Sequence, residues 1–120
     1  MSATHPFIVS EDHELIALHR SLFEAQFAVS PHDRDVPGSP ILANLANRVV
    51  DLLSQRDSRW TQWRNASNHP DRVEIARKRL LADPRWRDMP RQEKEQHVRN
   101  HLAPLVPDHD LVLSLVGTAA

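Results

Sequence analysis

The positions of the prolines constrain the fold of this chain more than any other feature of its sequence. Eight of the nine prolines lie where a segment of helical apolar spacing ends or the next one begins. These eight are Pro31, Pro37, Pro40, Pro70, Pro84, Pro90, Pro104 and Pro107. Proline breaks a helix in its interior but is accepted in the first turn. This placement therefore predicts short helices joined by proline-marked loops.

The first helical segment follows Ser10, which is the expected N-cap. Apolar residues recur there at spacings of three and four, which predicts an amphipathic helix over residues 11–29 with a broad buried face. Residues 1–9 are expected to form an extended lead-in to this helix. The buried stripe is predicted to contain Leu15, Leu18, Leu22, Ala25 and Val29, flanked by Ile16, Phe23 and Phe27.

A loop and a broken helix are predicted next. Residues 30–39 contain two prolines and a glycine among charged residues, a composition typical of loops. Ser39 followed by Pro40 predicts a helix start. One long helix over residues 40–66 is an alternative, but we favour a break at Asp57 that begins a second short helix. The inward stripe of the first part is predicted to be Leu42, Leu45, Val49 and Leu52.

Three further helices are predicted, at about residues 70–82, 90–103 and 107–117. Alternating leucines in the last of them leave a terminal strand as the lesser alternative. The basic residues expected to face outward from the first are Arg72, Arg77, Lys78 and Arg79. The chain, residues 1–120, is therefore predicted to be a single all-α domain, a compact bundle of five or six short helices.

The composition excludes several kinds of chemistry. Without cysteine the chain has no disulfide, no thiolate nucleophile and no cysteine-ligated zinc or iron–sulfur site. Its two glycines cannot build a phosphate-binding P-loop or a G-x-G-x-x-G dinucleotide turn. Neither a signal-peptide pattern nor a run of about 18 apolar residues is present. We therefore expect a cytoplasmic protein with no membrane partner.

A short segment around Trp86 resembles part of a known domain family. Residues 83–89, with the sequence DPRWRDM, followed by Glu93 and Lys94, resemble the second half of FF domains, which are small helical phosphopeptide-binding modules. The phenylalanine positions of that family are not matched, so its function is not carried over. The resemblance implies that Trp86 lies on a short turn and fills the gap between two helices.

Three residues in the helix at 90–103 could ligate a metal ion. Glu93, His97 and His101 are spaced four apart, and two imidazoles at i and i+4 can chelate a divalent metal. A third strong ligand has to come from elsewhere, with His13 and His19 as candidates. Because the chain has eight histidines, such a pair also arises without any ligand. His19 itself is expected to pack among apolar neighbours, and no cofactor beyond a divalent metal is predicted.

Charge is distributed unevenly along the chain. Residues 48–99 carry a net charge of +5, against −4 for residues 1–47 and −2 for residues 100–120. The basic segment contains all three tryptophans, and arginine with tryptophan can bind phosphates and stack on bases. Interspersed acids and an overall charge of −1 weaken this electrostatic attraction. Nucleic-acid binding is therefore one alternative function, through Arg59, Arg64, Arg77, Lys78, Arg79, Arg85 and Arg87.

The function that the sequence favours is association with another protein. The chain shows no catalytic signature, while its apolar helical faces are wide enough to be shared with a partner. We expect a small non-enzymatic regulatory or accessory protein that forms a homodimer or binds another protein. A second alternative is a helical protein that binds a metal or a small ligand through His97 and His101.

Overall fold

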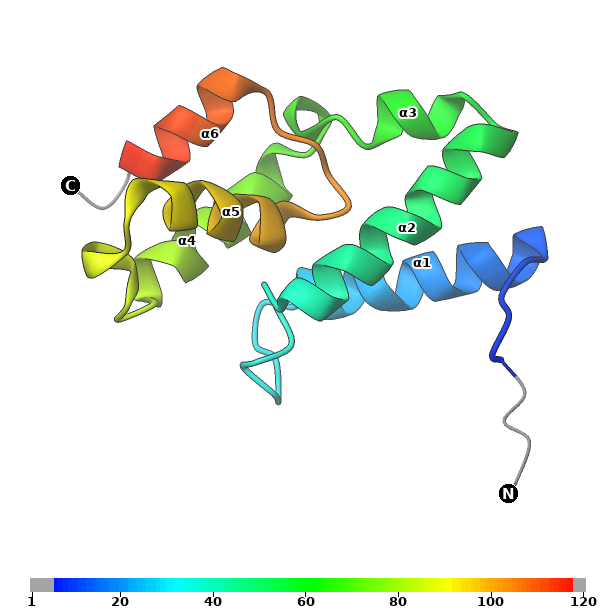
Figure 1. The fold of residues 1–120 in the computed structure, drawn as a ribbon, viewed down its shortest axis with the longest axis horizontal. Coiled ribbons are helices and arrows are strands. Elements are labelled where there is room, and N and C mark those ends of the chain that lie inside the picture. Colours follow the sequence, from blue (N-terminus) through cyan, green and yellow to red (C-terminus); the bar gives the residue numbers. More distant parts are fainter. Residues whose placement is uncertain (1–5, 118–120) are drawn as a thin grey trace.

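Six α-helices and two short 3₁₀ helices make up most of residues 6–117, the part of the chain that the computed structural model describes (Figure 1). They are α1 (Asp12–Gln26), α2 (Pro40–Arg56), α3 (Arg59–Trp63), η1 (Ala66–Asn68), α4 (Pro70–Ala82), η2 (Trp86–Asp88), α5 (Arg91–Leu102) and α6 (His109–Val116). Between residues 6 and 117 the only β-type pairing is one isolated bridge, Asn65 to Val106. No helix in this range is long and apolar enough to cross a membrane. The predicted all-α bundle of short helices is confirmed.

The sequence signals at the two ends of α2 act as predicted. Ser39 caps the helix, since its Oγ accepts a hydrogen bond from the backbone N–H of Leu42 at 3.4 Å, and Pro40 occupies the first turn. At the other end Asp57 is extended, and its carboxylate accepts hydrogen bonds from the backbone and the side chain of Arg59. The break confirms that α2 and α3 are separate helices.

Helix α1 is shorter than the predicted span of residues 11–29. Its N-cap is Glu11, which forms a capping box with Glu14, so the prediction of Ser10 as the N-cap is wrong by one residue. It ends at Gln26, and Val29 lies beyond it with 82% of its surface exposed. The carbonyls of Gln26 and Ala28, which the end of the helix leaves without helical N–H partners, accept hydrogen bonds from an arginine side chain of α4. Of the predicted extended lead-in, residues 6–9 carry no helix or strand, and residues 1–5 lie outside the described part.

The C-terminal half packs around Trp86. This residue lies in η2, between α4 and α5, and only 1% of its surface is exposed, which confirms that it fills the gap between two helices. Helix α6 covers the same core and begins at the Asp108 side chain, which accepts a hydrogen bond from the N–H of Leu111 at 2.7 Å. The alternative of a terminal strand is therefore wrong. The surrounding core contains Leu80, Val98, Leu102, Leu105, Val112 and Leu115.

A second core lies between α1 and α2. Leu15 of α1 packs with Val49 and Leu53 of α2. The two helices run antiparallel, and Arg56 at the end of α2 binds Asp12 at the start of α1 at 2.5 Å. Figure 1 shows this pair on one side of the molecule and α4, α5 and α6 on the other. The fold is thus a helical hairpin packed against a group of three helices.

Gln26 joins these two parts. It is fully buried at the end of α1, and its Oε1 accepts a hydrogen bond from the N–H of Gly38 at 2.8 Å. Its Nε2 donates to the carbonyls of Asn100 and Ala103, at 2.5 and 3.0 Å. In a continuing helix the Asn100 carbonyl would accept from the next turn, but Pro104 stands there and has no N–H. The Gln26 amide therefore replaces a hydrogen bond that the proline cannot make.

Candidate functional site

A cleft of about 820 Å³ lies between the loop of residues 29–40 and the facing parts of α4 and α5. Polar and charged side chains from both walls line it. The loop wall contributes Arg34, Asp35 and the backbone of Gly38. The helical wall contributes Arg79, Asp83, Arg85, His97 and His101. We name this feature the loop cleft.

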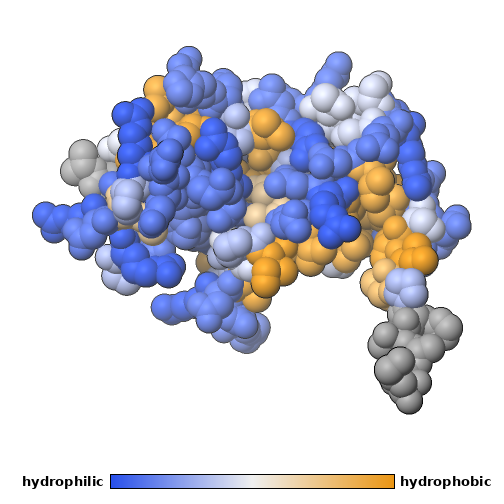
Figure 2. Space-filling view, viewed as in Figure 1, coloured by the Kyte–Doolittle hydropathy of each residue, from blue (hydrophilic) through white to orange (hydrophobic). Residues whose placement is uncertain are grey.

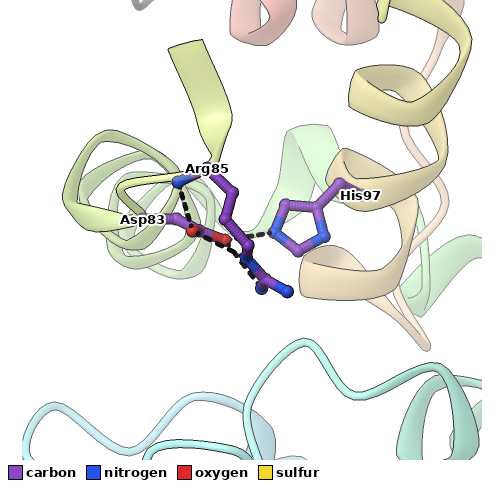
Figure 3. A network of polar contacts seen from close by, with 3 residues as sticks. All are labelled: Asp83, Arg85 and His97. Atoms are coloured by element: carbon purple, nitrogen blue, oxygen red, sulfur yellow. Dashed lines mark hydrogen bonds and ion pairs between the residues drawn. The ribbon is translucent and has the colours of Figure 1, made fainter. Parts of the chain in front are cut away.

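Asp83 organises the helical wall of the loop cleft (Figure 3). Its carboxylate accepts hydrogen bonds from the Arg85 backbone N–H at 3.0 Å, from the Arg85 guanidinium at 3.2 Å and from His97 Nε2 at 3.1 Å. The hydrogen bond from the Arg85 side chain has the largest part in lowering the pKa of Asp83 to about 2. The carboxylate is therefore ionised at neutral pH and can only accept hydrogen bonds. It follows that Nε2 of His97 carries a proton and that the ring is held in one orientation.

His101 lies one helical turn beyond His97 and is buried, with 7% of its surface exposed. The two rings stand edge to face, with their centroids 4.6 Å apart. Burial lowers the pKa of His101 to about 4, so its ring is neutral at pH 7. Its Nδ1 is buried and has no hydrogen-bond partner among the described residues. The two histidines thus differ: a carboxylate holds His97, whereas a ring nitrogen of His101 is unused.

Gly38 brings the loop wall against His101. Its φ of 76° lies in the left-handed region that favours glycine. A Cβ at this position would lie 2.3 Å from Cε1 and Nε2 of the His101 ring. Only glycine therefore allows the loop to take this path and approach the ring so closely.

Arg79 is turned inward, so the prediction that it faces outward is wrong. Its guanidinium donates hydrogen bonds to the carbonyls of Gln26 and Ala28 at the end of α1, and burial lowers its pKa. The C-terminal end of a helix carries partial negative charge, which favours a cation there. Arg79 therefore ties α4 to the end of α1 and forms part of the cleft wall between them.

The residues predicted to ligate a metal ion are brought together only in part. His97 and His101 line the loop cleft, whereas Glu93 is exposed on α5 and does not line it. Of the other candidates, His13 is exposed and His19 lies among aromatic rings. Within residues 6–117, no group of three or more histidine, aspartate or glutamate side chains is placed to hold a metal ion. This part of the chain supplies two imidazoles without a third ligand.

His19 is a packing residue, as predicted, and is only 7% exposed. The centroid of its ring lies 5.6 Å from that of Phe23, 5.1 Å from that of Trp60 and 4.9 Å from that of Trp63. Burial lowers the pKa of His19, which favours the neutral ring. His19 therefore helps to hold α3 against α1.

Most of the basic residues predicted to bind nucleic acid have partners within the fold. The ion pairs are Arg59–Asp57, Arg64–Asp51, Arg77–Glu74 and Arg85–Asp83. Arg64 and Arg79 also bind backbone carbonyls of distant segments. Lys78 and Arg87 are exposed. Arg64 and Arg79 thus help to hold the structure together, whereas exposed ion pairs such as Arg59–Asp57 add little stability. Nucleic-acid binding stays a prediction that a shift assay at low salt can test.

Helix α2 exposes apolar side chains that its periodicity predicts to be buried. Of the predicted inward stripe, Leu42 and Val49 are buried, whereas Leu45 and Leu52 are 41% and 39% exposed. The prediction is wrong for these two leucines because α2 packs against both α1 and α5, which shifts its buried arc toward its alanines and valines. Ile41, with 75% of its surface exposed, continues the same exposed side. We name Ile41, Leu45 and Leu52 the α2 stripe.

Hydrophobic surface extends beyond α2. Figure 2 shows it along the lower edge of the molecule, from the loop before α2 past the α1/α2 pair to the N-terminal lead-in. In the lead-in, Phe7 and Ile8 are 91% and 68% exposed. We name the surface of the helix pair that carries the α2 stripe the α1/α2 face.

Sequence reasoning missed three residues that shape the loop cleft. The sequence marks Asp83 only as the residue before Pro84, where a helix ends, and its contact with His97 joins separate elements. Gln26 falls inside a helical pattern with no sign of its distant partners. A usable signal exists at Gly38, since a lone glycine in a loop often marks a positive φ.

Comparison of the chain with protein-family models, with curated proteins and with solved structures finds no match. Any assignment of function therefore rests on the chemistry of the loop cleft and of the α2 stripe.

Proposed function

We propose that this chain is a non-enzymatic accessory or regulatory protein that acts by association, and that its α1/α2 face binds a second copy of the chain. The observation that carries this proposal is the exposure of the α2 stripe. Because successive helical residues are rotated by about 100°, Ile41, Leu45 and Leu52 lie within about 40° of one another around α2. They form an apolar row along α2, with the exposed Arg48 between Leu45 and Leu52, and exposed apolar side chains gathered on one side of a helix are typical of interaction sites.

The size of the α1/α2 face suits a small homodimer. Helix α2 has 17 residues and is therefore about 25 Å long. Two packed helices are about 20 Å wide, so the face covers roughly 500 Å² in projection. A standard interface takes roughly 800 Å² of accessible surface from each partner, and accessible area exceeds projected area. The projected area of the α1/α2 face is thus of the required order.

A second copy also fits the arrangement of the apolar residues, and the charge near the axis predicts a dependence on salt. If two α2 helices cross antiparallel about a two-fold axis, Leu45 of one copy meets Leu52 of the other, so one stripe serves both copies. The net charge of −1 per chain adds little repulsion. Arg48 is exposed on the same side of α2, between the two leucines, so its two copies approach each other near the axis. Salt screens this repulsion, so the dimer should become tighter as the salt concentration rises.

Sedimentation velocity over a range of protein and salt concentrations tests the proposal. We expect a monomer–dimer equilibrium for the wild-type chain and a monomer for the double variant Leu45→Asp/Leu52→Asp. Leu81→Asp is the matched control, because Leu81 is 45% exposed on α4 and lies outside the stripe. A wild-type chain that stays monomeric at high micromolar concentration contradicts the proposal. So does a control that weakens dimerisation as much as the double variant.

A further inference from the structure

We infer that the loop cleft binds a small molecule that carries a phosphate or carboxylate group. Its volume of about 820 Å³ lies within the range of about 300–1,000 Å³ typical of small-molecule sites. Its walls come from segments far apart in the sequence, namely the loop of residues 29–40, the end of α4 with the turn after it, and α5. The cleft is thus a built feature of the tertiary structure.

His101 adds a polar group to the wall of the cleft. Only 7% of its surface is exposed, and its Nδ1 has no hydrogen-bond partner among the described residues. Leaving a buried polar atom unpaired is costly. The approach of Gly38 leaves no room for a loop side chain that could cover the ring. Because Nδ1 itself is covered by the fold, the ring adds polar character to the wall, and the contacts to an anion have to come from the arginines of the cleft.

The charges in the cleft favour an anion. The carboxylate of Asp83 is already bound by Arg85 and His97. The hydrogen bonds of Arg79 go to two backbone carbonyls, which take two of the five N–H groups of a guanidinium. Arg34 on the loop wall adds another cation. Guanidinium groups bind phosphate and carboxylate oxygens through paired N–H groups, so this wall suits such an anion.

The cleft also contains one group that opposes an anion. Asp35 lies on the loop wall next to Arg34. The hydrogen bond to Asp83 has the largest part in raising the pKa of Arg85, and the nearby charge of Asp35 adds to this effect. Neutralising Asp35 removes a charge that repels an anion, while Arg85 keeps its hydrogen bonds to Asp83. Anion binding should therefore become stronger in Asp35→Asn, whereas the loss of Arg85 should weaken it.

Titration of the full chain with inorganic phosphate and, separately, with citrate, followed by heteronuclear NMR, tests the inference. We expect saturable shifts at residues of the loop cleft, and the tighter probe identifies the preferred anionic group. Arg85→Ala should weaken binding about tenfold, and Asp35→Asn should strengthen it. Arg87→Ala is the matched control, because Arg87 is an exposed arginine two positions away that does not line the cleft. It should change the affinity by less than about twofold.

Three outcomes would overturn the inference: no saturable binding of either probe, shifts centred outside the cleft, or equal losses in Arg85→Ala and Arg87→Ala. Circular dichroism of each variant checks that it folds. If Arg85→Ala fails to fold because Asp83 loses its partner, Asp35→Asn decides the matter, since Asp35 is exposed. Unchanged or weaker binding in Asp35→Asn then counts against an anion site.

Discussion

Replacing Gln26 with leucine tests how the helical hairpin is joined to the rest of the fold. Leucine is similar in volume and tolerates burial, but it cannot accept a hydrogen bond from Gly38 or donate to Asn100 and Ala103. All three partner groups belong to the backbone and remain when the side chain is changed. The Asn100 carbonyl has no substitute donor one turn later, because Pro104 lacks an N–H.

The size of the effect follows from these three groups. A buried backbone group left unpaired costs about 1–3 kcal/mol, and water can reach the part-buried Asn100 carbonyl more easily than the other two groups. Burial of the apolar leucine side chain returns about 1–2 kcal/mol. We therefore expect the free energy of unfolding to fall by about 2–4 kcal/mol. This is a large share of the roughly 5–15 kcal/mol that stabilises an ordinary domain.

Urea unfolding followed by tryptophan fluorescence and far-ultraviolet circular dichroism measures this loss. Gln55→Leu is the matched control, because it makes the same chemical change at an exposed position of α2. It should change the free energy of unfolding by less than about 0.5 kcal/mol. If Gln26→Leu is as stable as the control, the Gln26 hydrogen bonds add no net stability and the reasoning is refuted.

Three further predictions follow from the same contacts. Gly38→Ala should lower the free energy of unfolding by more than about 1 kcal/mol, because of the positive φ at this position and the clash of the new Cβ with His101. Gly117→Ala is the control and should leave the free energy of unfolding nearly unchanged, since its Cβ meets nothing within 4 Å. Chemical denaturation compares the two variants. Because burial lowers the pKa of His101 from 6.5 to about 4, the unfolded chain binds this proton first as the pH falls, so the free energy of unfolding should drop by up to about 3 kcal/mol between pH 6.5 and 4. An equally steep drop in His101→Asn would count against that assignment. Arg64→Ala should lower the free energy of unfolding by about 2 kcal/mol, because it removes a guanidinium that is only 14% exposed, with its ion pair and its hydrogen bond to a backbone carbonyl. Arg56→Ala is the control and should lower it by less than about 1 kcal/mol, since the ion pair of Arg56 is exposed. Thermal unfolding measures both.

Helix boundaries could be predicted from this sequence because they depend on neighbouring residues. The pair Ser39 and Pro40 starts α2 by local capping, and Asp57 ends it by binding the start of α3. The end of α1 was predicted three residues too late, and here the contact is not local. Val29 continues the apolar periodicity, but the carbonyls before it are taken by Arg79, which is distant in sequence.

The faces of the helices could be predicted less well, because they depend on where other helices lie. Leu45 and Leu52 fit an inward stripe by spacing, and only the position of α5 beside α2 shows that the buried arc is shifted away from them. Arg79 has the composition of a surface residue, and it turns inward because the end of α1 offers unpaired carbonyls. Spacing identifies which residues share a side of a helix, whereas tertiary contacts decide which side is covered.

The same contacts link the loop cleft to stability but leave the α1/α2 face separate from it. Gln26 fixes Gly38 on one wall and the end of α5, which carries His101, on the other. Removing the Gln26 hydrogen bonds should therefore change the width of the cleft as well as the free energy of unfolding. Anion binding should weaken in Gln26→Leu even where the variant is still folded.

None of the three residues of the α2 stripe lines the cleft, so Leu45→Asp/Leu52→Asp should abolish dimerisation and leave phosphate or citrate binding unchanged. Loss of both properties in that folded double variant would mean that dimerisation completes the cleft, and the two sites would then have to be treated as one.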